Sequence, residues 1–76
     1  MNNIYIVFGS QTTAIKIHKE ISKQLKLDSE LLQTPKKFKL RSCSYSVKIN
    51  SNDKDKVMDL INKLNVYVVG VYESNI

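Results

Sequence analysis

The chain has 76 residues and a net charge of +5, from twelve Lys and Arg against seven Asp and Glu. This length allows one small core, so we expect residues 1–76 to form a single domain. The positive charge favours anionic partners, and one cysteine excludes an intrachain disulfide and gives no sign of secretion. We expect a cytoplasmic protein without membrane contact, because the apolar runs are too short for a bilayer and the N-terminus has no basic signal region.

Three segments are expected to be strands from their composition. Ile4–Phe8 is rich in β-branched and aromatic residues and apolar on both faces, which predicts a central strand. Residues 30–34 form a weaker strand that Pro35 ends, because proline has no N–H for a ladder. Residues 66–72 predict the last strand, with Gly70 as a bulge.

A fourth strand follows from strict alternation between residues 43 and 49. Its two faces carry different side chains: Cys43, Tyr45, Val47 and Ile49 on one, and Ser44, Ser46 and Lys48 on the other. Because side chains in a strand alternate between faces, the first set predicts a buried face and the second a more polar face.

Two helices are predicted from apolar residues at spacings of three and four. The first covers residues 13–25, with Ser10 or Thr12 as its N-cap. The second follows residues 50–52, carries Asp53 in its first turn and ends at Asn65. The apolar stripes are Ala14, Ile17, Ile21 and Leu25 in the first helix, and Val57, Leu60, Ile61 and Leu64 in the second.

The resulting β-α-β-β-α-β order predicts an α+β, ferredoxin-like fold: a four-stranded antiparallel sheet with both helices on one face. In this topology the first two strands are parallel and end at the same edge of the sheet. The loop from Pro35 to Ser42 should therefore lie near residues 10–13. Cys43, facing the helix layer, is then expected close to the N-terminus of the first helix.

This placement would matter for the chemistry of the thiol. Four basic residues precede Cys43, namely Lys36, Lys37, Lys39 and Arg41. A thiol with an ordinary pKa of about 8.5 becomes more acidic beside a helix N-terminus or cations, and the thiolate is the reactive form. The alternative is an inert core thiol, because free cysteine is among the most buried residue types.

The chain also resembles a family of small bacterial domains, the selenium/sulfur carrier protein-like family, over nearly its whole length. The resemblance rests on Tyr5–Ala14, on the turn Thr34-Pro35-Lys36, on residues 42–47 and on the last helix and strand, residues 53–64 and 66–72. It implies that the protein is a carrier and not an enzyme. Cys43 would accept sulfur or selenium as a persulfide or selenopersulfide and pass it on. It further implies a cysteine desulfurase-type donor and an acceptor protein as partners.

Within this resemblance, Ser10, Thr12, Thr13, Lys36 and Arg41 are the expected anion-stabilising residues. Pro35, Ser42 and Ser44 flank the site. Two departures from the family stand out. Ser44 replaces the usual glycine, and a serine cannot adopt some of the backbone geometries open to glycine. Lys36 replaces an arginine, and a lysine cannot form the bidentate hydrogen bonds of a guanidinium group.

Other functions are weighed against this one. His18, the only histidine, lies at the edge of a buried stripe and is interpreted as structural, and the lack of further Cys or His argues against zinc or another cofactor. The basic run with Phe38 could bind nucleic acid, but the central strands lack the aromatic pattern of RNA-binding modules. A binding or regulatory module with a structural cysteine stays open as the alternative.

The open face of the sheet could form a homodimer or bind a partner. The residues expected to make it apolar are Tyr5, Tyr67, Tyr72, Val69 and Val71.

Overall fold

The computed structural model describes residues 2–34 and 44–74, and all statements below concern these residues. Its strands are β1 (Asn3–Phe8), β2 (Glu30–Gln33), β3 (Tyr45–Asn50) and β4 (Gly70–Ser74). Its helices are α1 (Gln11–Glu20), extended by the π-helical turn η1 (Ile21–Leu25), and α2 (Lys54–Leu64), preceded by the 3₁₀ turn η3 (Ser51–Asp53).

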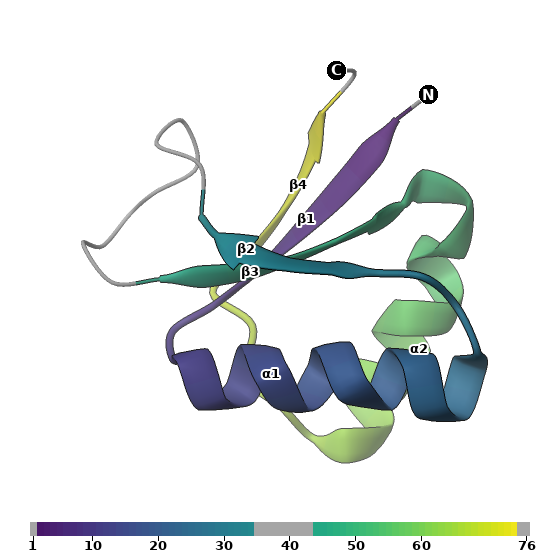
Figure 1. Ribbon diagram of the computed structural model, residues 1–76, viewed down its shortest axis with the longest axis horizontal. Coiled ribbons are helices and arrows are strands. Elements are labelled where there is room, and N and C mark those ends of the chain that lie inside the picture. Colours follow the sequence, from purple (N-terminus) through teal and green to yellow (C-terminus); the bar gives the residue numbers. More distant parts are fainter. Residues whose placement is uncertain (1, 35–43, 75–76) are drawn as a thin grey trace.

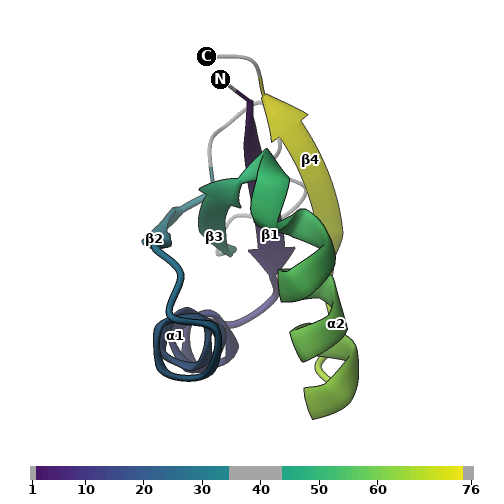
Figure 2. The same cartoon turned by 90° about the vertical axis from the view of Figure 1, so that its right-hand side faces the viewer.

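The four strands form one sheet in the order β2-β3-β1-β4 (Figure 1). Every neighbouring pair is antiparallel. Both helices lie on the same side of this sheet, as the view turned by 90° shows (Figure 2). The predicted ferredoxin-like α+β fold is therefore confirmed, with β1 in the centre because Ile4–Phe8 can be covered on both faces.

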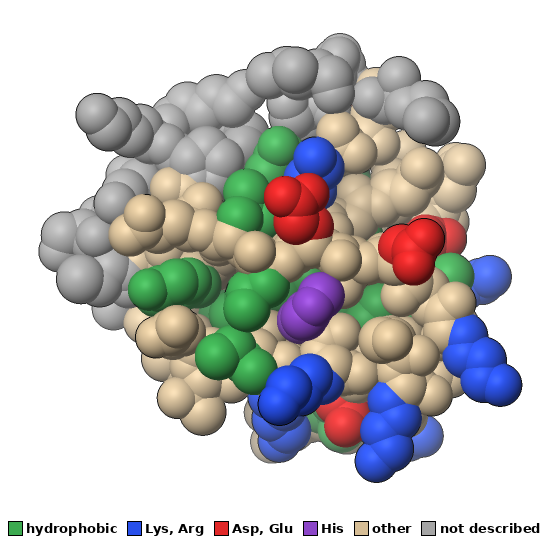
Figure 3. Space-filling view, viewed as in Figure 1, with side chains coloured by type: hydrophobic (Ala, Val, Ile, Leu, Met, Phe, Trp, Pro, Cys, Tyr) green, Lys and Arg blue, Asp and Glu red, His purple; other side chains and the backbone are tan. Residues whose placement is uncertain are grey.

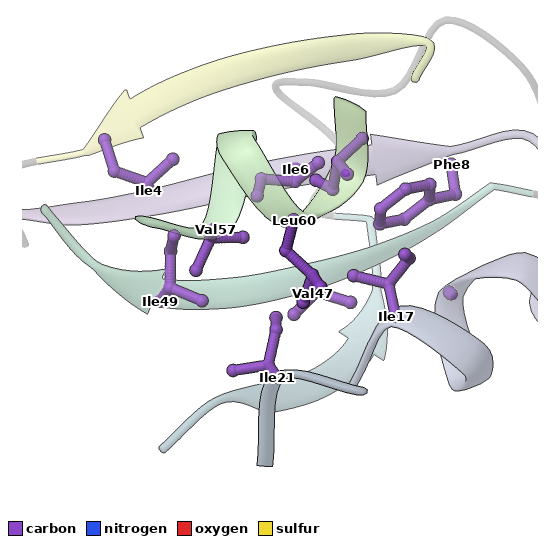
Figure 4. Packing of buried hydrophobic residues seen from close by; sticks show 11 residues of the cluster. Ile4, Ile6, Phe8, Ile17, Ile21, Val47, Ile49, Val57 and Leu60 are labelled. Carbon is purple, nitrogen blue, oxygen red and sulfur yellow. The ribbon is translucent and has the colours of Figure 1, made fainter. Parts of the chain in front are cut away.

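The core lies between the sheet and the two helices (Figure 4). Alternate residues of the two central strands point into it, and each helix adds its apolar stripe. Its buried members are Ile4, Ile6, Phe8, Ala14, Ile17, Ile21, Val47, Ile49, Val57, Leu60 and Ile61. The apolar stripes predicted from spacing thus account for the helical half of the core.

The first helix begins at Gln11, with Ser10 as its N-cap. Its last turn widens into η1, and Lys26 ends it in the left-handed conformation, with φ 54°. The carbonyl of Ile21 accepts the N–H groups of both Lys26 and Leu27, which satisfies a carbonyl that the helix end would otherwise leave free. Residues 26–29 then connect η1 to β2.

The second helix is fixed at both ends by asparagine. The side chain of Asn50 accepts the N–H of Asn52 at 2.9 Å, which starts η3. Asn65 adopts the left-handed conformation, φ 56°, after the last turn of α2. Asparagine tolerates this region better than most residues, so the predicted stop at Asn65 is confirmed.

The prediction that the last strand starts at residue 66 is wrong, because β4 begins only at Gly70. Val66 still donates its N–H to the carbonyl of Ile61 in α2. Residues 66–69 therefore connect the helix to the sheet. Gly70 is not a bulge, since it pairs in register opposite Val7. Residues 66–69 have the propensity of a strand, but their conformation is decided by the need to connect α2 to the sheet.

The composition predicted for the open face of the sheet is wrong in three places. Val71 lies opposite Ile6, and both pack into the core on the helix side. The other two residues precede β4, namely Tyr67, which is 76% exposed, and Val69. Tyr5 and Tyr72 do face each other on neighbouring strands. The error at Val71 arises because adjacent residues of a strand point to opposite faces, so Val71 cannot share the face of Tyr72.

We predict opposite effects of glycine at two exposed lysines of the first helix. Lys26→Gly should raise the free energy of unfolding by about 0.5–1 kcal/mol, because a left-handed conformation is costly for lysine but not for glycine. Lys23→Gly, within η1, should lower it by about 1 kcal/mol, since glycine is a poor helix residue. Urea denaturation of both variants checks this, and a loss of stability in Lys26→Gly would contradict it.

Candidate functional site

Three strand ends meet at one edge of the sheet. Tyr45, the first residue of β3, lies opposite Phe8, the last residue of β1, and opposite Gln33, the last residue of β2. One step further, the N–H of Thr34 donates to the carbonyl of Ser44 at 3.2 Å. The residues before and after the segment 35–43 are thus paired with each other, at the edge where β1 ends and leads into α1.

Several predicted site residues lie outside the described residues, and their roles stay predictions. They are Pro35, Lys36, Arg41, Ser42 and Cys43, together with Lys37 and Lys39. The residues that the structure does place are Ser10, Thr12 and Thr13 at the start of α1, and Ser44 just before β3.

The hydroxyl groups at the start of α1 mainly hold its first turn. Ser10 Oγ accepts the N–H of Thr13 at 3.2 Å and donates to Thr13 Oγ1 at 2.9 Å. The carbonyl of Ser10 also accepts the N–H of Ala14 at 3.2 Å. Ser10 and Thr13 therefore fix the helix end, and their hydroxyls are already engaged there, while Thr12 is exposed. An anion at the start of α1 would therefore be attracted by the positive end of the helix dipole.

Three hydroxyl-bearing residues gather on the side of the sheet that faces away from the helices. Thr34 and Ser46 are 4% and 0% exposed, and their hydroxyl oxygens lie 2.8 Å apart in a hydrogen bond. Ser44 is 2% exposed and lies opposite Thr34 in the ladder. The alternation of the sequence predicts a more polar face here, but it contains no signal that these serines are buried.

Ser44 differs from the other two because its hydroxyl is unsatisfied. Its Oγ is buried and has no hydrogen-bond partner in the part of the chain that the structure describes. Leaving a buried hydroxyl without a partner costs roughly 1–3 kcal/mol. Native proteins keep few such groups, and each one calls for an explanation. Sequence reasoning placed Ser44 on the polar face of the strand and beside the expected site, where it replaces a glycine, but it did not predict an unsatisfied hydroxyl.

The positive charge of the protein is concentrated in the segment between Thr34 and Ser44. The described residues hold eight lysines and all seven acidic residues, a net charge of about +1. The remaining charge of +4 comes from Lys36, Lys37, Lys39 and Arg41. Among the described lysines, many of those visible in Figure 3 lie over the helix layer. Acidic side chains are interspersed there, so that layer is not a strongly charged surface.

His18 does not contribute to this edge. Its Nδ1 lies 2.6 Å from Ser29 Oγ, in the connection between η1 and β2. The bond joins the first helix to the start of the second strand, which agrees with the structural interpretation of this histidine. Within residues 2–34 and 44–74, no group of three His, Cys, Asp or Glu side chains could hold a metal ion.

Two grooves among the described residues lie away from the edge that holds Ser44. One, of about 480 Å³, lies at the far end of the sheet, where Asn3, Glu30 and Lys48 meet Asp53. Another, of about 400 Å³, lies between Leu25 and the Lys56–Lys63 side of α2.

No helix of the described part is long and apolar enough to cross a membrane.

The fold and this edge together define a small α+β protein whose only cysteine, at position 43, follows a basic segment. The chain belongs to the family described as "Putative Se/S carrier protein-like", whose model matches residues 3–73. No curated protein and no solved structure matches the chain. The family suggested by the sequence motifs is thus confirmed, and the match runs from Asn3, the first residue of β1, to Glu73 in β4.

Two serine-to-alanine variants should differ in stability although both serines are buried on the same face. Ser46→Ala leaves Thr34 Oγ1 without its partner and should lower the free energy of unfolding by about 1–2 kcal/mol. Ser44→Ala removes a hydroxyl that has no partner, so stability should stay within about 0.5 kcal/mol or rise. Urea denaturation distinguishes the two. A larger loss in Ser44→Ala than in Ser46→Ala would show that the Ser44 hydroxyl is satisfied in solution.

Proposed function

We propose that this protein is a non-catalytic carrier of sulfur or selenium and that Cys43 holds the carried atom. The match to the carrier-like family over residues 3–73 is the observation that carries the proposal. Cys43 is the only thiol of the chain, so no other cysteine could form the covalent bond to sulfur or selenium. A reducing compartment such as the cytoplasm would keep this thiol free.

The chemistry is a pair of thiol exchange steps. The Cys43 thiolate attacks the outer sulfur of a donor persulfide, R–S–SH. The donor S–S bond breaks, its electron pair leaves with the donor thiolate, and Cys43–S–SH forms. In the second step a nucleophile of the acceptor attacks the same outer sulfur, and the Cys43 thiolate leaves. With selenium, the transferred atom is selenium in a selenopersulfide, and the electron balance is the same.

Two features of the chain support a stabilised thiolate at this position. Ser44, the next residue, lies at the edge where β1 leads into α1, so the positive end of the α1 dipole is at the same end of the molecule. Lys36 and Arg41 add positive charge within seven residues of the cysteine. Exposed cations are screened, so the helix end should weigh more than any one of them.

The proposed partners follow from the two exchange steps. A cysteine desulfurase-type enzyme would supply the outer sulfur or selenium atom, and a second protein would accept it. The net charge of +4 between Lys36 and Arg41 favours acidic surfaces on both partners. Neither step needs a metal or an organic cofactor, because thiolate attack and thiolate departure balance all atoms and electrons.

Replacement of the thiol should abolish the carrier function. Cys43→Ser should take up no sulfur or selenium from a desulfurase supplied with cysteine or selenocysteine, because an alcohol is a poor nucleophile near neutral pH. Intact-protein mass spectrometry before and after exposure to the donor measures this. Tyr67→Phe, at an exposed residue outside the site, is the control and should load like the wild type. Transfer to an acceptor that persists in Cys43→Ser would instead favour a binding module with a structural cysteine.

The basic segment should lower the pKa of the thiol by a small amount. In Lys36→Gln/Arg41→Gln, the pH midpoint of iodoacetamide alkylation should rise by a few tenths of a unit, because exposed charges contribute little each. Lys56→Gln/Lys63→Gln removes the same charge from α2 and serves as the matched control, with no expected shift. Equal shifts in the two double variants would mean that only net charge matters. A native protein that resists alkylation at every pH, but reacts in urea, would indicate a buried core thiol.

A further inference from the structure

The strand β4 forms one outer edge of the sheet, because β1 is its only neighbour among the described strands. Figure 2 shows β4 as the outermost strand, on the side of the molecule where α2 lies. An edge strand presents backbone N–H and C=O groups on its outer side, where they are a template for another strand. Most proteins protect such an edge with lysine, proline, a bulge or a very short strand.

The two edges of this sheet differ in how well they are protected. The strand at the other edge, β2, has four residues, and its first and last residues, Glu30 and Gln33, are polar and exposed. Residues 66–74 contain no lysine and no proline, and their single charged residue is Glu73. The Glu73 carboxylate accepts the side-chain N–H of Asn2 at 3.0 Å, which holds it beside the start of β1. The β4 edge is therefore the less protected of the two.

The face of β4 that points away from the helices is already packed against its own chain. A Cβ atom at Gly70 would lie 2.9 Å from the ring of Tyr72, so this ring lies over the glycine. Val7, opposite Gly70 on the neighbouring strand, is 1% exposed. A second molecule would therefore gain more from the backbone edge of β4 than from this face.

The part of the chain that forms α2 and β4 carries little net charge. Residues 53–74 hold three lysines and four acidic residues, a net charge of −1, whereas the whole chain has +5. The exposed residues of α2 include both signs, Lys56 and Lys63 with Asp55 and Asp59, so a twofold axis can bring opposite charges together. Two copies of the chain would repel each other least on this side, and an acidic partner would be attracted to the more positive rest of the chain.

We infer that this protein forms a homodimer in which the β4 strands of two copies pair antiparallel about a twofold axis. A strand is complementary to its own copy in this orientation, because each copy supplies the same N–H donors and C=O acceptors to the other. The two sheets become one continuous sheet, and neither copy keeps an open β4 edge. A chain of 76 residues has a small core, so this pairing also stabilises each copy. The inference does not depend on the carrier function.

The first test uses the unmodified protein. Sedimentation equilibrium from micromolar to millimolar concentration should show a monomer that converts into a species with the mass of two chains. Over the same range, backbone hydrogen exchange should become slower in β4, because the N–H groups on its outer side become hydrogen-bonded. When about nine-tenths of the chains are dimers, exchange of these groups should be about tenfold slower, since only the monomer exposes them. Exchange in β2, at the other edge, should not depend on concentration.

The second test places a lysine in the middle of each edge strand. Tyr72→Lys puts like charges on the two paired β4 strands and should raise the dimer dissociation constant by roughly tenfold. Leu32→Lys is the matched control, because Leu32 is also half-buried and lies on the same face of the sheet, in β2. It should dimerise like the wild type. Far-ultraviolet circular dichroism establishes that each variant is folded, and the exchange experiment remains decisive if one is not.

The outcomes decide between β4 pairing and other arrangements. A dimer with slower exchange in β4, weakened by Tyr72→Lys but not by Leu32→Lys, bears the inference out. A dimer whose β4 exchange is unchanged, or that both variants weaken equally, refutes it in favour of another surface. A chain that stays monomeric at every concentration also refutes it and leaves the β4 edge to a strand of a different protein. None of these results depends on sulfur uptake, so failure of the dimer leaves the proposed carrier function standing.

Discussion

The antiparallel pairing of β1 with β3 determines where everything else in this protein can lie. Phe8 lies opposite Tyr45, and Tyr45 lies opposite Gln33, so the ends of β1 and β2 and the start of β3 share one edge. The core depends on the same register, because it places Ile6 and Val47 side by side beneath the helices. A shift of β3 by one residue would turn Val47 to the face opposite that of Ile6.

Most of the fold could be predicted because its signals are local. The stripe that includes Ile17 and Ile21 and the N-cap at Ser10 depend on residues only three or four apart. The start of β4 could not be predicted in the same way. Residues 66–69 have the composition of a strand, but they must first carry the chain from α2 back to the sheet, a constraint set by the distance between elements.

The candidate site was only partly predictable for a related reason. The sequence identifies Cys43 as the only thiol, and the β-α-β-β-α-β order predicts that its segment begins and ends where β1 leads into α1. The burial of Ser44 and Ser46 on the face away from the helices cannot be read from their own strand. Alternation distinguishes their face from that of Val47 but says nothing about what lies above it.

The hydroxyl groups at this edge of the sheet differ in what they contribute to stability. Thr34 and Ser46 satisfy each other, and Ser10 satisfies Thr13, so these hydroxyls stabilise the edge without any ligand. Ser44 lies in the same ladder, but its hydroxyl has no partner among the described residues and contributes no comparable bond. Leaving that hydroxyl buried without a partner costs roughly 1–3 kcal/mol, so the stability of this edge depends on the Thr34–Ser46 and Ser10–Thr13 bonds rather than on Ser44.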